Sequence, residues 1–345
     1  MILIIAESLS SYKIKSFKGL EDKMPKLDAI AHQGISYKNF YSNSHNTTGG
    51  IFSILTGKTM INDYFGLGNY HASSYYNETL PKRLAKYGYF TEFFTGIDLA
   101  HGMDVLLKYS GFAELSISDD PFYNGKERII FNSVADNVLF DNVLTHLKTE
   151  NKKRPFLYVV STITTHGPYI DPITKERSFD KTLAFLDNEL DRFINNLKQT
   201  DFFENGMVII TGDHHAMLPV SNEEYKQYGV LGDSAIPLII IDYATENENK
   251  EEYNIYSQTD IAPSLEYYLT EKGCFNKFQR NLFDSDYHDN VCLIHSYRSP
   301  KDKVEVYCSE EKHADIYLNG DKTTISDESL SAYKDYVLYL RTQPM

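Results

Sequence analysis

Tryptophan is absent from this 345-residue chain, and cysteine is scarce. The three cysteines, Cys274, Cys292 and Cys308, are spaced too widely for a CxxC metal-binding motif. Because their number is odd, we do not expect a disulfide framework, and we interpret them as core or surface thiols.

Long apolar runs are also missing. No stretch approaches the ~20 apolar residues that a membrane-spanning helix needs. The chain opens with Met1 and the apolar run 2–5, without the basic region that begins a signal peptide. As written, the sequence predicts a cytoplasmic protein. The alternative is a periplasmic or cell-surface catalytic domain whose membrane anchor lies upstream of this sequence.

Basic residues are outnumbered by acidic ones. The chain has 34 Lys and Arg against 48 Asp and Glu, which gives a net charge of −14. Binding of nucleic-acid phosphates needs clustered Lys and Arg, so we expect no nucleic-acid partner. Hydrophobic residues make up 42% and charged residues 24%, as in ordinary globular proteins. The length predicts two domains, or one large α/β domain with an appendage.

Four short apolar runs predict strands that are buried on both faces. They cover residues 2–5, 156–160, 207–210 and 238–241. Apolar residues at helical spacing predict helices over residues 25–33, 80–87, 137–148 and 182–197. In the last of these helices we expect Asp187, Glu189 and Asp191 to point outward. Strands that alternate with helices predict a layered α/β sheet.

The pattern changes after Gly273. Residues 304–307 and 316–318 are typical of antiparallel strands, with a turn at 319–321. A final helix is predicted over residues 328–341, capped by Ser326 or Asp327. We therefore predict an α/β core over residues 1–273 and a C-terminal α+β subdomain over 274–345 that packs on it.

Carboxylate and imidazole side chains follow two of the predicted strands. Glu7 comes after the first strand, and Asp213 and His214 come after the strand at 207–210. Ligands collect at the carboxyl ends of strands in open α/β sheets. This mixed oxygen and nitrogen set favours Zn²⁺ or Mn²⁺. The alternative is structural: Glu7 caps a helix and Asp213 begins a turn.

Polar and glycine residues at 43–50 lead directly into an apolar helical pattern. This is typical of a helix N-terminus that holds an anion such as phosphate. A threonine hydroxyl there could attack phosphorus after losing its proton to a metal. The alternative is an N-cap cluster of Asn and Thr without chemistry. The nearby Gly57-Lys58-Thr59 is not a P-loop, because Phe52 stands where the first glycine of that motif belongs.

His166 follows a third predicted strand, in the run Thr165-His166-Gly167-Pro168. Imidazole titrates near neutral pH, so His166 is a candidate proton carrier. A buried structural histidine is the alternative. His101 is a second candidate for proton transfer.

Taken in order, these motifs resemble the sulfatase-like branch of the alkaline phosphatase superfamily. Among its members the chain is most similar to phosphoethanolamine and phosphoglycerol transferases, including lipoteichoic acid synthases. The resemblance covers roughly residues 1–270. Its pieces are residues 4–9, 24–31, 34–35, 39–41, 47, 53–57, 80–84, 88–89, 165–169, 212–214 and 260–264.

The resemblance implies a three-layer α/β sandwich with a mostly parallel central sheet, followed by a small antiparallel subdomain. It also implies that Glu7, Asp213, His214 and Thr47 bind one divalent metal ion, Zn²⁺ or Mn²⁺. Thr47 would be the nucleophile that forms a phospho-threonine intermediate. The family's spacing to a Leu-Thr-Gly element, here Leu55–Gly57, selects Thr47 over Thr48. His166 would contact the phosphoryl group or assist the leaving group.

The chain departs from two branches of this superfamily. It lacks the C/S-x-P-x-R motif of true sulfatases, which argues against sulfate ester hydrolysis. We find no Asp-x-x-x-His set for a second metal ion in the corresponding region. The area that lines the acceptor pocket in lipoteichoic acid synthases also differs. We assign Asn46, His101 and His215 to substrate binding.

The predicted function is a metal-dependent phosphotransferase that moves a phosphoethanolamine- or phosphoglycerol-type group. Its partners would be a phosphorylated small-molecule or lipid donor and a glycan or lipid acceptor. A hydrolase of phosphomonoesters or phosphodiesters with the same site is the first alternative. A non-catalytic binding module on this fold is the second, although the sequence retains every residue of the implied metal site.

Overall fold

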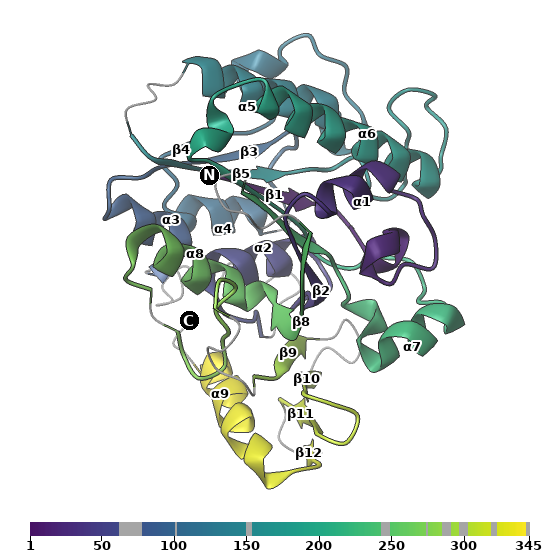
Figure 1. The fold of residues 1–345 in the computed structure, drawn as a ribbon, viewed down its shortest axis with the longest axis vertical. Helices are drawn as coiled ribbons and strands as arrows, with labels where there is room; N and C mark the ends of the chain where they lie inside the picture. Colours follow the sequence, from purple (N-terminus) through teal and green to yellow (C-terminus); the bar gives the residue numbers. More distant parts are fainter. Residues whose placement is uncertain are drawn as a thin grey trace. The chain divides into compact units, whose positions relative to one another are not determined.

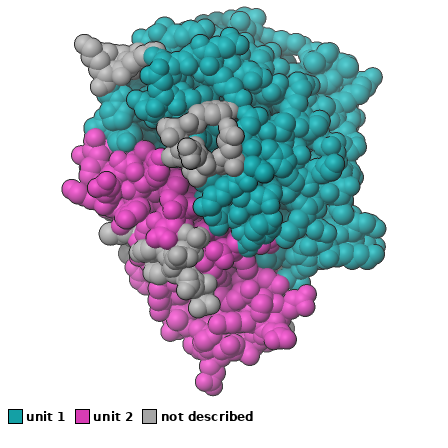
Figure 2. All heavy atoms as spheres, in the orientation of Figure 1, with its two compact units in different colours: residues 1–38, 88–99, 112–253 teal, residues 39–87, 100–111, 254–345 magenta. Residues whose placement is uncertain are grey.

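The computed structural model describes residues 1–61, 78–100, 102–149, 154–242, 249–273, 275–284, 291–296, 303–318 and 323–342. The chain divides into two compact units, which Figure 2 shows in different colours. Unit 1 contains residues 1–38, 88–99 and 112–253, and unit 2 contains residues 39–87, 100–111 and 254–345. Each unit combines segments that are far apart in the sequence. The domain boundary predicted between residues 273 and 274 stays a prediction.

The large sheet has eight strands in the order β4-β3-β5-β1-β6-β7-β2-β8 (Figure 1). Their bounds are β1 (Ile2–Ala6), β2 (Ile35–Tyr41), β3 (Phe90–Thr95), β4 (Glu114–Ser116), β5 (Phe156–Ser161), β6 (Met207–Gly212), β7 (Leu238–Asp242) and β8 (Lys250–Ser257). The five strands from β4 to β6 run parallel to their neighbours, and β7 is antiparallel to both β6 and β2. The prediction of an α/β fold with a mostly parallel sheet is confirmed.

β1 lies inside this sheet between β5 and β6, and all of its residues are buried. That environment explains its apolar, β-branched sequence. Ile5 is in register with Ser161 of β5, and Ala6 is in register with Gly212 of β6. The three strands therefore end at nearly the same level, so the residues that follow them emerge at one edge of the sheet.

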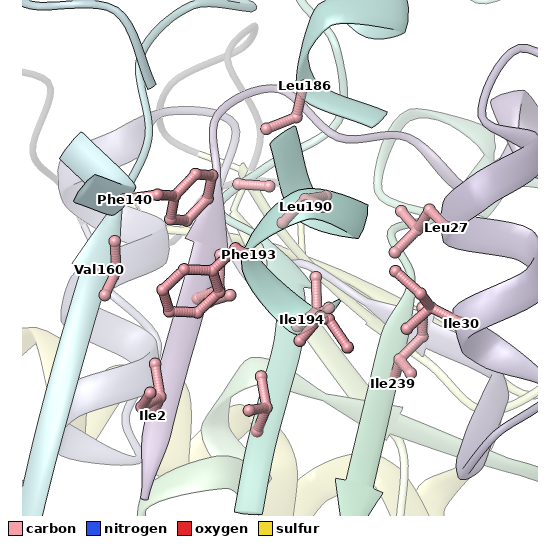
Figure 3. Close-up of a cluster of buried hydrophobic side chains, with 14 of the residues drawn as sticks. Ile2, Leu27, Ile30, Phe140, Val160, Leu186, Leu190, Phe193, Ile194 and Ile239 are labelled. Atoms are coloured by element: carbon pink, nitrogen blue, oxygen red, sulfur yellow. The ribbon is translucent and has the colours of Figure 1, made fainter. Parts of the chain in front are cut away.

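The helices of unit 1 are α1 (Pro25–Ala31), α5 (Asp136–Thr149), α6 (Phe179–Lys198) and the short α7 (Asn222–Tyr228). The apolar stripe of α6 packs with residues of α1, α5 and alternate residues of β1, β5, β6 and β7 in one core. Figure 3 shows this cluster, in which Phe193 of α6 stacks on Phe140 of α5 with ring centroids 4.8 Å apart. The helices predicted at 25–33, 137–148 and 182–197 are confirmed, with small shifts at their ends.

One prediction about α6 is wrong. Asp187 is buried, whereas Glu189 and Asp191 are partly exposed as expected. The Asp187 carboxylate accepts hydrogen bonds from the amides of Leu27 at 2.7 Å and Lys26 at 3.1 Å. These amides belong to the first turn of α1 and have no partner within that helix. Asp187 therefore caps α1 across the interface between the two helices.

Unit 2 contains the helices α2 (Thr47–Thr56), α3 (Leu80–Ala85), α4 (Met103–Ser110), α8 (Ile261–Thr270) and α9 (Ser331–Thr342). Its small antiparallel sheet consists of β9 (Leu293–Ser296), β10 (Lys303–Tyr307), β11 (His313–Tyr317) and β12 (Thr324–Ile325). The strands predicted at 304–307 and 316–318 form β10 and much of β11, and the turn predicted at 319–321 lies outside the described residues. Asp327 is the cap, because it accepts the Ser329 amide at 2.8 Å before α9.

The cysteine prediction is wrong for two of the three residues. Cys292 and Cys308 form a disulfide, with their Cα atoms 4.4 Å apart. The antiparallel pairing of β9 with β10 brings the two cysteines together, because each lies at an end of the same ladder. Cys274 lies outside the described residues.

A search of the described residues for membrane spans gives a negative result: none of their helices combines the length and apolarity needed to cross a bilayer.

We predict that Asp187→Ala destabilises the protein by about 1 to 2 kcal/mol, because the two amides of α1 lose their acceptor. The measurement is the free energy of unfolding from urea titration. Asp191→Ala is the matched control, since Asp191 makes only an exposed ion pair with Lys26 at 3.4 Å. Its cost should stay below about 0.5 kcal/mol. Equal costs for the two variants would contradict the capping role of Asp187.

Candidate metal centre and catalytic site

Glu7, Asp213 and His214 come together in unit 1. Glu7 follows the last residue of β1, and Asp213 and His214 follow the last residue of β6. One ligand atom from each of the three lies within 4.8 Å of the other two. All three side chains are buried. The parallel pairing of β1 with β6 produces this convergence, as the sequence predicts.

The electrostatics of this cluster favour a cation. His214 Nε2 lies 3.5 Å from Glu7 Oε1 and 3.3 Å from Asp213 Oδ2. Burial raises the pKa of Asp213 to about 7, and the negative charge of Glu7 raises it further. Burial of two neighbouring carboxylates costs free energy unless a positive charge compensates them.

The ring of His214 is held in one tautomer. Its Nδ1 lies 2.7 Å from the carbonyl oxygen of His215, which can only accept a hydrogen bond. Nδ1 must therefore carry the proton, and the lone pair of Nε2 faces the two carboxylates. A backbone acceptor on the far nitrogen is the usual support for a histidine that binds metal.

The carboxylate of Asp213 is fixed by its surroundings. Asp213 Oδ1 accepts the Ser8 amide at 2.8 Å and the His214 amide at 2.7 Å. Ser8 adopts a left-handed conformation with φ 54°, which is uncommon for a residue with a side chain. At Gly212, a Cβ atom would lie 2.6 Å from the carbonyl oxygen of Leu9. Only glycine allows the chain after β6 to pass so close to the chain after β1.

The turn that carries His166 is bonded to both sides of Glu7. The Glu7 amide donates to Thr162 Oγ1 at 2.9 Å, and Thr165 Oγ1 donates to the Glu7 carbonyl at 2.5 Å. His166 Nδ1 donates to the Gly167 carbonyl at 2.5 Å, which leaves Nε2 as the basic atom. The peptide bond between Gly167 and Pro168 is cis. His166 and Glu7 thus belong to one hydrogen-bonded frame.

Asp136 anchors the same turn from the first residue of α5. Its carboxylate accepts the amides of Ile163 at 2.9 Å and Thr164 at 3.2 Å. In return the Asp136 amide donates to Thr164 Oγ1 at 3.2 Å. Complete burial raises the pKa of Asp136 to about 6, and these hydrogen bonds oppose that shift.

His215 does not lie at a solvent-open surface. Its Nδ1 is 2.8 Å from the Ala216 carbonyl and its Nε2 is 3.1 Å from Glu224 Oε1. Both partners are acceptors, so a doubly protonated ring satisfies both contacts. The ring also stacks on Tyr12, with centroids 5.7 Å apart. A role of His215 in substrate binding stays a prediction.

Asn46 and Thr47 belong to unit 2, where they begin α2. Asn46 is the N-cap, and its Oδ1 accepts the Gly49 amide at 2.9 Å. Thr47 is the first residue of the helix and is half-buried. The assignment of Thr47 as metal ligand and nucleophile stays a prediction, as does that of Asn46 in substrate binding. His101 lies outside the described residues.

Sequence reasoning missed the residues that hold the site together: Asp136, Thr162 and Thr165. The two threonines lie in the polar run after β5 that drew attention to His166, so their position was a usable signal. Asp136 stands one residue before the predicted helix at 137–148. A carboxylate at a helix start usually caps its own helix, and nothing in the sequence shows that this one bonds another segment.

Comparison with known proteins follows from this geometry. The Sulfatase family model matches residues 1–267. Lipoteichoic acid synthase 1 of Bacillus subtilis is 25% identical over 323 residues, which cover 85% of this chain and 49% of that protein. Lipoteichoic acid synthase of Staphylococcus saprophyticus is 25% identical over 261 residues, covering 69% of this chain and 38% of that protein. The chain therefore spans about half or less of these relatives.

Solved structures share the fold. A Vibrio parahaemolyticus protein of the alkaline phosphatase superfamily has a TM-score of 0.77 and 19% identity, covering 99% of this chain and 85% of that one. A lipoteichoic acid synthase from Listeria monocytogenes has a TM-score of 0.73 and 20% identity, covering 100% and 93%. The fold and the site thus define an enzyme of the alkaline phosphatase superfamily. Within it, the chain belongs to the sulfatase family.

The residues of this chain fit the divalent metal ion that members of the superfamily use. Two buried carboxylates and one imidazole with a free Nε2 lone pair offer oxygen and nitrogen ligands to one point. Such a mixed set suits Zn²⁺ or Mn²⁺. Glu7, Asp213 and His214 would hold the ion, and which metal it is stays a prediction.

We predict opposite effects of Asp213→Asn with and without metal. In metal-free protein the variant should be at least as stable as the wild type, because it removes a buried negative charge beside Glu7 while retaining an acceptor for the two amides. Addition of Zn²⁺ or Mn²⁺ should raise the melting temperature of the wild type and leave that of the variant nearly unchanged. The measurement is differential scanning fluorimetry after treatment with chelator. A variant that is stabilised by metal as strongly as the wild type would remove Asp213 from the ligand set.

We predict that Asp136 makes stability depend on pH. The folded protein favours the neutral acid, so it binds more protons than the unfolded chain between about pH 4 and about pH 6. The contribution of Asp136 to stability is therefore complete below about pH 4 and is lost as the pH rises to about 6. Asp136→Asn should lack this part of the slope, a difference of up to about 3 kcal/mol across the interval. Urea titrations at each pH measure it, and parallel curves for the two proteins would contradict the assignment.

Proposed function

We propose that this protein is a metal-dependent phosphotransferase that moves a phosphoethanolamine- or phosphoglycerol-type group to a hydroxyl acceptor on a glycan or lipid. One observation carries the proposal: the buried cluster of Glu7, Asp213 and His214 shares a hydrogen-bonded frame with the turn of His166. Membership of the sulfatase family and the names of its relatives, lipoteichoic acid synthases, support this reaction class.

Each residue has a distinct role in this reaction. Glu7, Asp213 and His214 hold the ion, with Thr47 as the fourth ligand. When bound, the ion stabilises negative charge on the phosphoryl oxygens and lowers the pKa of a hydroxyl ligand. Thr47, as an alkoxide, bonds to phosphorus while the ester bond to the donor alcohol breaks. His166 Nε2 supplies the proton that the departing alcohol needs.

The second step reverses these roles. The acceptor hydroxyl gives its proton to His166 Nε2 while its oxygen bonds to phosphorus, and the bond from phosphorus to Thr47 breaks. Thr47 returns to the alkoxide form, so the protein is unchanged after one cycle. If water takes the place of the acceptor, the same residues perform hydrolysis. Positioning and charge stabilisation account for most of the rate in phosphoryl transfer.

We also infer that the protein works outside the cytoplasm. The disulfide between Cys292 and Cys308 supports this inference, because such bonds persist in oxidising compartments and are rare in the reducing cytosol. This favours the periplasmic or cell-surface alternative over the cytoplasmic one.

We predict that Thr47→Ala lowers the turnover of a chromogenic phosphodiester in the presence of Mn²⁺ by at least about a thousandfold. Thr47→Ser should retain part of the activity, because it keeps a hydroxyl nucleophile. Thr48→Ala is the matched control from the next position of α2 and should lose little. Mass spectrometry of acid-quenched wild type should show one phosphate on the peptide that contains residue 47. Full activity of Thr47→Ala would exclude the covalent mechanism.

Transfer and hydrolysis are separated by the products. With a glycerophosphate or phosphoethanolamine lipid as donor, a transferase forms a new phosphodiester on an added alcohol acceptor, and donor turnover depends on acceptor concentration. Turnover that is fast in water alone and insensitive to acceptor would favour the hydrolase.

A further inference from the structure

Phe131 combines three unusual properties. It is an apolar side chain with 54% of its surface exposed. Its backbone is left-handed, with φ 50°, and the next residue, Asn132, is left-handed as well, with φ 57°. This conformation costs roughly 1 to 2 kcal/mol for a residue with a bulky side chain. Burial of the ring does not offset that cost, so the position is a candidate for a functional role.

Polar contacts hold this segment in place. Asn132 Nδ2 donates to Asp98 Oδ2 at 3.1 Å, and Arg128 Nη1 donates to the Asn132 carbonyl at 3.2 Å. The Ile129 amide donates to the Ser133 carbonyl at 2.7 Å across the two left-handed residues. The ring of Phe131 is therefore presented to solvent by a fixed loop.

The ring lies directly beside His166. Their centroids are 4.9 Å apart, and the ring planes are perpendicular. A second contact joins the same two parts of the chain, because Lys175 Nζ lies 2.5 Å from Glu127 Oε1. We call residues 127–132 and 166–175 the His166 rim. All of them belong to unit 1, so this surface does not depend on the placement of unit 2.

We propose that Phe131 is a binding platform for a sugar ring of the acceptor. This inference rests on the proposed function, in which the acceptor must bring a hydroxyl group to His166. A pyranose has an apolar face of C–H groups that packs on an aromatic ring and a border of hydroxyl groups that bond to polar neighbours. The rim supplies both, since Asn132, Arg128 and Glu127 surround the exposed ring.

The same surroundings argue against an acyl chain as the occupant. An acyl chain needs a continuous apolar groove to leave water. The exposed ring of Phe131 is instead flanked by charged and amide side chains, which an acyl chain would desolvate without replacing their hydrogen bonds. We therefore assign carbohydrate to the acceptor.

The test is saturation-transfer NMR and calorimetric titration of the full chain with neutral oligosaccharides built from glucose, galactose or N-acetylglucosamine. At least one of them should bind the wild type, and Phe131→Ala should weaken its binding by about tenfold or more. Phe131→Tyr should bind nearly as well as the wild type, because it keeps the ring. Tyr225→Ala is the matched control, since Tyr225 on α7 is a 52% exposed aromatic residue outside the rim. It should change nothing.

Phe131→Gly separates binding from folding. Glycine adopts positive φ without strain, so this variant should melt at the same temperature as the wild type or higher while it loses oligosaccharide binding. Loss of both stability and binding in Phe131→Gly would indicate a structural role and overturn the platform. The proposal also fails if every oligosaccharide leaves the wild type unchanged, or if Phe131→Ala binds as tightly as the wild type.

Failure of the platform and failure of the proposed function give different results. Thr47-dependent phosphodiester turnover without oligosaccharide binding would overturn the platform alone. Phe131-dependent oligosaccharide binding without phosphodiester turnover would support the platform and overturn the phosphotransferase. Competition by a nucleoside or by a lipid micelle at the same ring, with no effect of sugars, would replace carbohydrate as the ligand class.

Discussion

The burial of two carboxylates against one imidazole is the constraint around which unit 1 is organised. Without a compensating charge this cluster destabilises the fold, and the surrounding backbone is arranged to keep it nevertheless. Ser8 is left-handed so that its amide reaches Asp213, and Gly212 has no side chain so that two strand ends pass closely. Such local strain beside buried charge is the pattern of a site that is selected for chemistry and stabilised by a bound cation.

The support of the site comes from the next strand of the sheet. Because β5 is also parallel to β1, the turn after it reaches Glu7, and hydroxyl groups on Thr162 and Thr165 bond the backbone of Glu7 on both sides. Asp136 then connects this turn to the start of α5. A displacement of α5 would therefore reach the metal ligands through hydrogen bonds rather than through apolar packing, which tolerates small shifts more readily.

Prediction from sequence succeeded where a segment's environment is uniform. The runs at β1, β5, β6 and β7 are apolar on both faces because the sheet is covered on both, and they were found with nearly correct ends. β3 was missed, since Glu92 interrupts its apolar pattern. That carboxylate is buried and paired with His146 at 3.2 Å, a contact 54 residues away in the chain. Asp187 was misplaced for the same reason, because its partners lie on another helix.

The sequence by itself determined the strands, the helices and the identity of the metal ligands, because each of these depends on local periodicity or on residues that directly follow a strand. Tertiary structure decided which polar groups are buried. The roles of Asp136 and Asp187, the disulfide of Cys292 with Cys308 and the contact of Phe131 with His166 all join distant segments. No local pattern encodes such pairings, since hydrogen bonds and ring contacts act over a few ångströms and depend on which chain segments the fold brings within that distance.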